Sequence, residues 1–251
     1  MRSLSAHSSS GFGPRTGNLL AFDTSTELMS VAVQRGGAQA GQVWQHSGPG
    51  GAQTSTHLIP VIQALMTQAD LEFDQLDAIV FGNGPGAFTG LRTACSVAQG
   101  LAFGAQVKVL PVNTLWAVAE QARFQSAAAL ARCQVTALLD ARMDEMYAGR
   151  YEFQDGQWRH NGGHRLLRPE DLVCEADDLL AGNVFAAYGA RLPASMALRV
   201  NALPTATALL RLAPSLLAAG AALPAELALP LYVRDKVAQT TLERAACKAV
   251  L

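Results

Sequence analysis

Apolar residues recur along the first half of the chain with the spacings of strands and helices in alternation. This pattern predicts strands at residues 19–22, 29–34, 41–46, 76–81 and 107–112. It predicts helices at residues 93–103 and 56–68, the second capped by Thr56. The first half of the sequence is therefore expected to form a compact α/β unit.

The second half repeats part of this pattern. It predicts strands at residues 135–139, 146–153 and 184–188, and helices at 113–123 (capped by Asn113), 170–180 and 205–217, the last broken near Pro214. In both halves an apolar strand ends in an aspartate, Asp23 or Asp140, and a polar turn leads into a returning strand. We therefore predict α/β lobes over residues 19–113 and 114–238, with a disordered extension at 1–18 and a flexible tail at 239–251.

A glycine-rich stretch joins a predicted strand to a predicted helix. Residues 82–92 read GNGPGAFTGLR. Glycines let another surface approach the backbone closely, and the free N–H groups at a helix start favour anions. Turns of this composition are also plain connectors between a strand and a helix. The stretch alone leaves both interpretations open.

Part of this stretch, GPGAFTGLR at residues 84–92, resembles the signature shared by TsaB and TsaD, bacterial proteins that build threonylcarbamoyladenosine in tRNA. Further segments resemble the TsaB side: LAFDTST at 20–26, STHLIP at 55–60, LLDARMDEMY at 138–147 and PLYVRDKVA at 230–238. From about residue 19 to 238 the chain is identified as a member of the TsaB family. This resemblance implies an α/β, two-lobe, actin-like fold of the ASKHA type, similar to sugar kinases and Hsp70-like ATPases.

The same resemblance implies a place for a nucleotide. In actin-like ATPases the turn after the first strand holds phosphates, and an aspartate there helps to organise the metal. The candidate nucleotide or phosphate contacts are Asp23, Thr24, Ser25, Gly84, Gly86 and Asp140. An Asp-Thr-Ser sequence is equally typical of a hairpin turn, and this turn has no glycine and carries Glu27. Any ATP or ADP is expected near the partner interface.

His57 invites comparison with TsaD, which holds a metal with two histidines one helical turn apart. In this chain Gln53 and Val61 stand one turn from His57. We therefore interpret His57 as a capping or interfacial residue and predict no metal site. The sequence has no Walker A motif, no Gly-x-Ser-x-Gly elbow and no His-Glu-x-x-His motif, and we predict no catalytic residue.

Two predicted helices carry apolar residues that we assign to more than one stripe. Core burial accounts for such a pattern, and so does an interface with a partner. In TsaB-like proteins the first helices make a homodimer, and the same surface pairs with TsaD. The resemblance favours partner contact through His57, Leu58, Ile62, Leu65, Met66, Leu91, Ala94, Val97, Ala98 and Leu101.

Composition limits how such a protein meets tRNA. The 251 residues are 50% apolar and 16% charged, with a net charge of −1, whereas a protein that grips tRNA alone usually has a basic excess. We expect contact with tRNA only through a complex. The four cysteines form no Cys-x-x-Cys pair, and no apolar run is long enough for a membrane span, so we expect a cytoplasmic protein.

The resemblance thus implies a non-catalytic subunit of the threonylcarbamoyladenosine modification complex. Its expected partners are a TsaD-like catalytic subunit and a TsaE-like ATPase, with a homodimer when the chain is alone. The alternative hypothesis is an independent actin-fold ATPase or kinase that uses Asp23 and Asp140, or a metallopeptidase-like enzyme.

Overall fold

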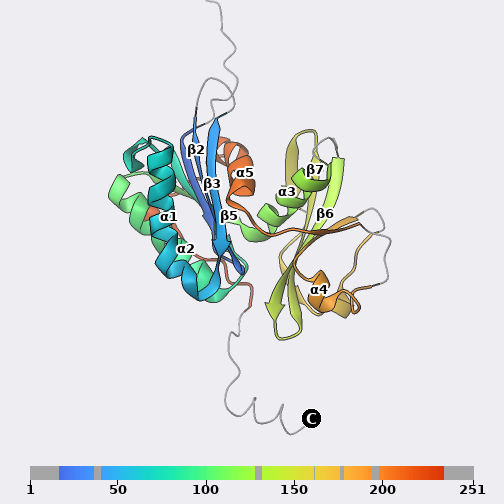
Figure 1. Cartoon of the computed structure of the whole chain (residues 1–251). Coiled ribbons are helices and arrows are strands. Elements are labelled where there is room, and N and C mark those ends of the chain that lie inside the picture. The colour runs from blue at the N-terminus through green and yellow to red at the C-terminus, as the bar shows by residue number, and fades with distance from the viewer. Residues whose placement is uncertain are drawn as a thin grey trace, which may run out of the picture.

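The computed structural model describes residues 17–36, 41–127, 132–160, 162–175, 178–193 and 198–234. Within this part of the chain, two β-sheets lie side by side, each with its own helices, and helix α3 lies between them (Figure 1). Residues 1–16 of the predicted extension and the predicted tail at 239–251 lie outside the described residues. Gly17 and Asn18 are described, and Asn18 bonds to Asp77 and to the Gln75 carbonyl.

The first sheet has the order β3-β2-β1-β4-β5. Its strands are β1 (Leu19–Asp23), β2 (Leu28–Arg35), β3 (Gln42–Pro49), β4 (Ala78–Gly84) and β5 (Lys108–Asn113). The first three strands are antiparallel, whereas β4 and β5 run parallel to β1. All five predicted strands are confirmed, although β3 extends beyond residue 46.

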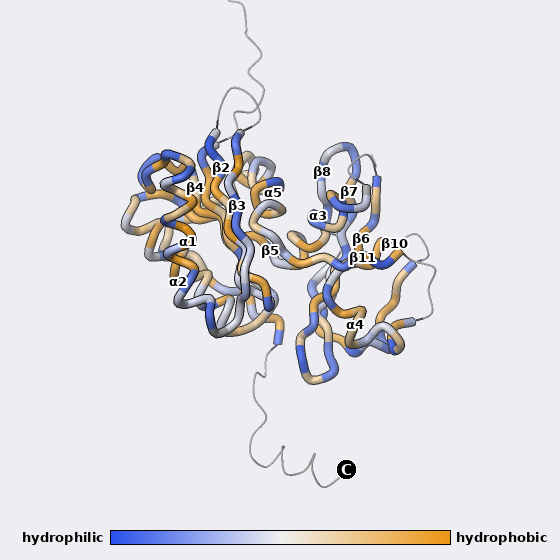
Figure 2. The backbone as a smooth tube through the Cα atoms, in the orientation of Figure 1, coloured by the Kyte–Doolittle hydropathy of each residue, from blue (hydrophilic) through white to orange (hydrophobic). Residues whose placement is uncertain are grey.

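Alternate residues of β1 face opposite layers of helices, as the two-residue period of a strand requires. Leu20 and Phe22 pack in one cluster with α1 (Thr54–Gln68) and α2 (Phe88–Ala105). Leu19 and Ala21 pack in another with α5 (Ala206–Ala218). Figure 2 shows hydrophobic residues along the inner strands of this sheet, whereas the edge strand β3 is largely hydrophilic. The inner strands of the sheet are therefore buried on both faces, whereas the edge strand β3 is largely exposed.

Helix α5 follows the second sheet in sequence but covers the first sheet in space (Figure 1). Thr205 caps it by accepting a hydrogen bond from the Ala208 amide at 3.2 Å, and Ala206 N–H donates to Ser30 Oγ at 2.9 Å. The helix continues past Pro214, where the sequence analysis expected a break. The division at residue 113 thus stays a prediction, and it assigned α5 to the lobe that α5 does not cover.

The second sheet has the order β11-β10-β6-β7-β8, and β9 pairs with β7. Its strands are β6 (Arg132–Arg142), β7 (Glu145–Gln154), β8 (Gln157–His160), β9 (Arg165–Leu167), β10 (Asp178–Gly182) and β11 (Arg199–Asn201). Short 3₁₀ helices are η1 (Gly51–Gln53), η2 (Phe73–Gln75), η3 (Pro169–Asp171) and η4 (Ala225–Leu227).

Two predictions for this half are wrong. The predicted helix at 170–180 is replaced by η3, an irregular segment and strand β10, which pairs in parallel with β6. The predicted strand at 184–188 is the short helix α4 (Phe185–Tyr188). Residues 178–182 form a strand because they pair with the buried edge of β6, and this hydrogen bonding overrides a weak helical pattern.

Helix α3 (Thr114–Ala127) joins the two halves through a buried polar group. Glu120 is 2% exposed and accepts hydrogen bonds from Arg123 on its own helix, from Arg211 of α5 and from Trp158 Nε1 of β8. Asn113 Oδ1 accepts from the Trp116 amide at 3.2 Å, as predicted for the start of this helix. The carboxylate of Glu120 thus holds elements of both halves together.

Candidate functional site

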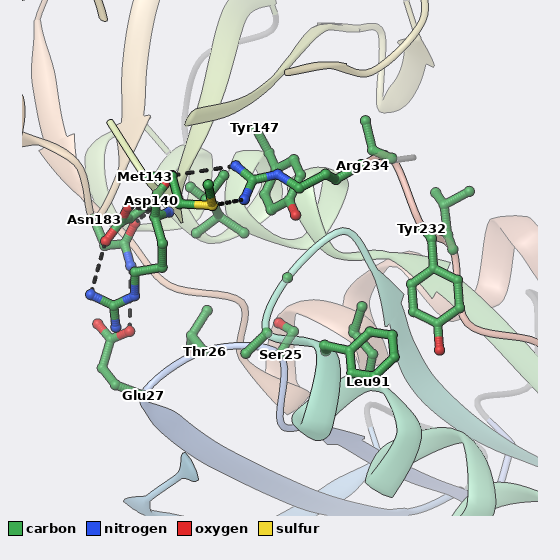
Figure 3. Close-up of a pocket in the computed structure, with 18 of the residues that line it drawn as sticks. Ser25, Thr26, Glu27, Leu91, Asp140, Met143, Tyr147, Asn183, Tyr232 and Arg234 are labelled. Atoms are coloured by element: carbon green, nitrogen blue, oxygen red, sulfur yellow. Dashed lines mark hydrogen bonds and ion pairs between the residues drawn. The ribbon is translucent and has the colours of Figure 1, made fainter. Parts of the chain in front are cut away.

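A cavity of about 440 Å³ lies between the two halves of the molecule. One side is built by the β1–β2 turn and the start of α2, and the other by the β6–β7 turn (Figure 3). The segment 231–234 lines it as well. The residues that line the cavity are Ser25, Thr26, Glu27, Gly51, Gly86, Ala87, Phe88, Leu91, Leu139, Asp140, Ala141, Arg142, Met143, Tyr147, Asn183, Leu231, Tyr232, Val233 and Arg234.

Asp23 lies beneath this cavity rather than in its wall. Its side chain is fully buried, and Oδ1 accepts hydrogen bonds from the Ser25 amide at 2.9 Å and from Ser25 Oγ at 2.7 Å. Oδ2 has no hydrogen-bond partner among the described residues and faces Gly82. Burial raises the pKa of Asp23 to about 6, although the hydrogen bonds from Ser25 lower it. The Asp23–Ser25 pair is thus a hairpin turn that bonds to itself.

The glycines of residues 82–92 let the β1–β2 turn pack directly on the turn before α2. A Cβ at Gly86 would lie 2.6 Å from the Ser25 carbonyl oxygen, and a Cβ at Gly90 would overlap with the Thr24 carbonyl oxygen. Thr24 Oγ1 donates to the Gly90 carbonyl at 2.8 Å, and the Ala87 amide donates to the Ser25 carbonyl at 2.7 Å. The space that these glycines leave open is therefore filled by the backbone of residues 24–25.

Gly84 makes room for a different segment. It has a φ of +120°, and a Cβ there would lie 2.5 Å from the Leu231 carbonyl oxygen. The Leu231 amide donates to the Asn83 carbonyl at 2.6 Å, and the Gly84 amide donates to Thr114 Oγ1 at 3.0 Å. The space beside Gly84 is thus filled by the backbone of Leu231, a contact that the sequence did not predict.

Asp140 lines the opposite wall of the cavity. Its Oδ1 accepts hydrogen bonds from the Arg142 amide at 2.7 Å and from Tyr188 Oη at 2.9 Å, and its Oδ2 pairs with the Arg142 guanidinium at 3.2 Å. Asn183 bonds to the Asp140 amide at 2.9 Å and, at 3.4 Å, reaches Glu27 on the facing wall. Asp140 and Glu27 therefore flank one end of the cavity (Figure 3).

The β6–β7 turn at the rim has an unusual backbone. Arg142, Met143 and Asp144 have φ angles of 61°, 57° and 60°, a conformation that costs energy in residues other than glycine. Asp144 pairs with Arg191 at 2.8 Å, and Arg234 donates to the Arg142 carbonyl at 3.3 Å. These contacts hold the turn in place. No spacing in the sequence indicated that Tyr188, Asn183 and Arg234 would meet near this turn, or that Tyr232 would line the cavity from the other side.

The candidate phosphate contacts therefore lie in one region, but only some of them are open to the cavity. Ser25, Gly86 and Asp140 line the cavity, whereas Asp23 and Thr24 are buried beneath it and Gly84 lies under Leu231. The two arginines in the cavity wall are paired with carboxylates, Arg142 with Asp140 and Arg234 with Glu145. Among the described residues, no group of three or more His, Cys, Asp or Glu side chains is arranged to hold a metal ion.

The candidate interface residues divide in a similar way. His57 is exposed on α1, and Val97 and Leu101 of α2 are half-buried. Six others are at most 5% exposed and belong to the core that packs against the first sheet: Leu58, Ile62, Leu65, Met66, Ala94 and Ala98. Leu91 is 1% exposed and lines the cavity. The open face of the two helices instead presents Ile59, which is 42% exposed, and Phe103, which is 71% exposed.

Comparisons with known proteins place this architecture in a defined class. A family model described as "TsaD: tRNA N6-adenosine threonylcarbamoyltransferase" matches residues 46–242. The solved structure "YeaZ from Pseudomonas aeruginosa" superposes with a TM-score of 0.77 at 39% identity, covering 86% of this chain and 100% of that one. The protein is therefore a member of the actin-like, ASKHA-type class, which confirms the fold predicted from the sequence.

Curated relatives narrow the class further. The Haemophilus influenzae "tRNA threonylcarbamoyladenosine biosynthesis protein TsaB" is 35% identical over 207 residues, which is 78% of this chain and 84% of the relative. The protein of the same description from Escherichia coli is 32% identical over 231 residues, or 88% and 96% of the two chains. This chain belongs to the TsaB family. In the described part of the chain, no helix combines the length and apolar character that a membrane span requires.

Proposed function

We propose that this chain is a non-catalytic subunit in the biosynthesis of threonylcarbamoyladenosine in tRNA. It binds and organises a TsaD-like catalytic subunit, which transfers the threonylcarbamoyl group, together with a TsaE-like ATPase. Membership of the TsaB family supports the pathway, because the relatives are described as tRNA threonylcarbamoyladenosine biosynthesis proteins. The near-neutral net charge supports contact with tRNA only through the complex, in the cytoplasm.

One observation carries the non-catalytic part of this proposal. The glycine stretch at residues 82–92, which could cradle an anion, is packed against the chain's own carbonyl groups, those of Thr24 and Ser25 over Gly90 and Gly86. The Ala87 amide is committed to the Ser25 carbonyl at 2.7 Å. A phosphate at this place would have to displace a backbone hydrogen bond and then meet carbonyl oxygens, which repel it.

The partner surface follows from the exposed side of α1 and α2. Leu58 and Ala98 face the core, so we propose that His57, Ile59, Val97, Leu101 and Phe103 supply the contact, both with a TsaD-like subunit and in a homodimer. Large apolar side chains that stay open on a helical face are typical of interface anchors. Any ATP or ADP in the assembly would lie near this interface.

Reconstitution tests the proposal. Threonylcarbamoyladenosine formation is measured by nucleoside mass spectrometry with a TsaD-like subunit, a TsaE-like ATPase, ATP, threonylcarbamoyl-AMP and an ANN-decoding tRNA, with this chain present or omitted. We expect product only in the complete mixture, and Asp23→Asn retains most of the activity. Equal product without this chain would contradict the role in the complex.

The lone chain provides the second arm of this test. Incubated with ATP and Mg²⁺, and separately with peptides, it is expected to show no turnover. ATP hydrolysis that Asp23→Asn abolishes would instead support the alternative, an independent ATPase or kinase of the same fold. Peptide cleavage would support the metallopeptidase-like alternative.

A further inference from the structure

The described chain passes between the two halves of the molecule three times. It leaves the first sheet at the junction of β5 and α3, and it returns from β11 to α5. It then reaches the second half again at residues 231–234, which we name the strap. The first two passages join packed strands and helices, whereas the strap has no regular secondary structure. Its attachment therefore rests on a small set of contacts.

The first two strap residues contact the first half of the molecule. The Leu231 amide donates to the Asn83 carbonyl at 2.6 Å, and its own carbonyl lies over Gly84. Tyr232 Oη accepts a hydrogen bond from Arg92 Nε at 3.1 Å, and its ring lies 5.2 Å from that of Phe88. Figure 3 shows Tyr232 on the side of Leu91, across the cavity from Asp140.

The last two strap residues contact the second half. Val233 packs against the core of the second sheet. Arg234 is 13% exposed and bonds to Glu145 Oε2 at 2.5 Å and to the Arg142 carbonyl at 3.3 Å. Its other guanidinium nitrogen lies 3.1 Å from Met143 Sδ (Figure 3). Within four residues, the chain thus exchanges contacts with one wall of the cavity for contacts with the other.

We propose that the strap is a releasable latch that sets the separation of the two lobes and so controls access to the cavity. Gly84 makes room for the strap on the first lobe, because any side chain at this position would collide with the Leu231 carbonyl. Arg234 is its lock on the second lobe, because a partly buried guanidinium bonded to a carboxylate is a strong contact. When the strap leaves, the lobes keep their own cores and the α3 contacts, and the cavity opens.

Hydrogen–deuterium exchange of the full chain tests this latch. In Arg234→Gln, which keeps a polar side chain but removes the charge, we expect exchange to rise about tenfold at the β6–β7 turn. We expect the same rise at residues 83–91, although none of these described residues forms a hydrogen bond or ion pair with Arg234, because the strap leaves both lobes together. Tyr232→Ala, which acts from the first lobe, produces the same two changes. The buried amides of α1 exchange as in the wild type.

Arg132→Gln is the matched control. It removes an arginine that pairs with Glu152 at 3.0 Å on the second lobe, away from the strap. We expect no change at residues 83–91 in this variant. Faster exchange confined to the lobe that carries the mutated contact would overturn the latch, because the two attachments would then act independently. Unchanged exchange, or a rise that extends to the amides of α1, would overturn it as well.

Discussion

Glu120→Gln tests how far a buried ion pair holds the two halves of this molecule together. The Glu120 side chain is 3% exposed, and its carboxylate accepts four hydrogen bonds: two from Arg123 at 2.8 and 2.9 Å, one from Arg211 at 2.7 Å and one from Trp158 at 2.9 Å. Glutamine has nearly the same shape but no charge, and its NH₂ group would face N–H groups that now donate to the carboxylate. Arg211 is then left partly buried without its counter-charge.

The expected loss follows from that geometry. Removing one partner of a buried, hydrogen-bonded ion pair costs about 3–5 kcal/mol, because the remaining charge is not compensated. Since glutamine still accepts one bond, we expect a loss of about 3 kcal/mol in the free energy of unfolding. Urea unfolding followed by circular dichroism measures it. Glu175→Gln removes an exposed partner of Arg150 and serves as the control, with little expected change.

The pH dependence supplies a second check. Burial raises the pKa of Glu120, but hydrogen bonds from Arg123 and Trp158 and the charge of Arg123 outweigh it, so the pKa lies below its ordinary value of 4.5. A lowered pKa in the folded state means that the stabilisation is complete above pH 4.5 and is lost as the pH falls through the folded-state pKa. The gap between wild type and Glu120→Gln should therefore close on acidification. A loss under about 1 kcal/mol, or a gap that widens in acid, would refute this reasoning.

Three further predictions concern the glycine turn, its aspartate and the open helical face. Gly90→Ala should lose about 2 kcal/mol of unfolding free energy, because the new Cβ would overlap with the Thr24 carbonyl. The control Gly100→Ala lies in open space on the same helix and should gain about 0.5–1 kcal/mol. Equal urea midpoints for the two variants would contradict this account of the packing. Burial raises the pKa of Asp23 to about 6, so its ionisation disfavours the folded state as the pH rises through that value. The stability of Asp23→Asn relative to wild type should therefore rise by about 3 kcal/mol between about pH 4 and 7, and a flat difference across that range would count against it. Phe103→Ser should keep the fold and weaken binding to a TsaD-like partner at least about tenfold in calorimetry, whereas Ala98→Arg should unfold the core; full affinity of Phe103→Ser would exclude this face.

Much of the first half of the fold could be predicted because local and tertiary signals agree there. β1 and β4 are short apolar runs flanked by polar turns, and they form the buried centre of the first sheet. In the second half, the residues of β10 have neither strand alternation nor a strong helical stripe. Only the edge of β6, which pairs with them, makes them a strand. That edge is distant in sequence, so the pattern did not reveal it.

The candidate contacts stay predictions, and their packing could not be predicted from the sequence. Asp23, the glycine stretch and Asp140 were the candidate contacts; Gly86 and Asp140 line one cavity, whereas Asp23 is buried beneath it. The sequence did not indicate that the glycines accommodate the chain's own carbonyl groups, because nothing local distinguishes a glycine that faces a ligand from one that faces backbone. Leu58 and Met66 were assigned to an interface. Residues four, seven or eight positions apart on a helix form a single stripe, however, and in α1 this stripe faces the sheet.

The position of α5 has a consequence for biosynthesis. Ala21 and Ala32 of the first sheet are covered by residues 206–218, so this sheet remains open on one face until these residues have been synthesised. The N-terminal half cannot complete its core while translation proceeds, as an autonomous domain would. A nascent chain stalled before residue 206 would therefore present a bare apolar sheet to chaperones.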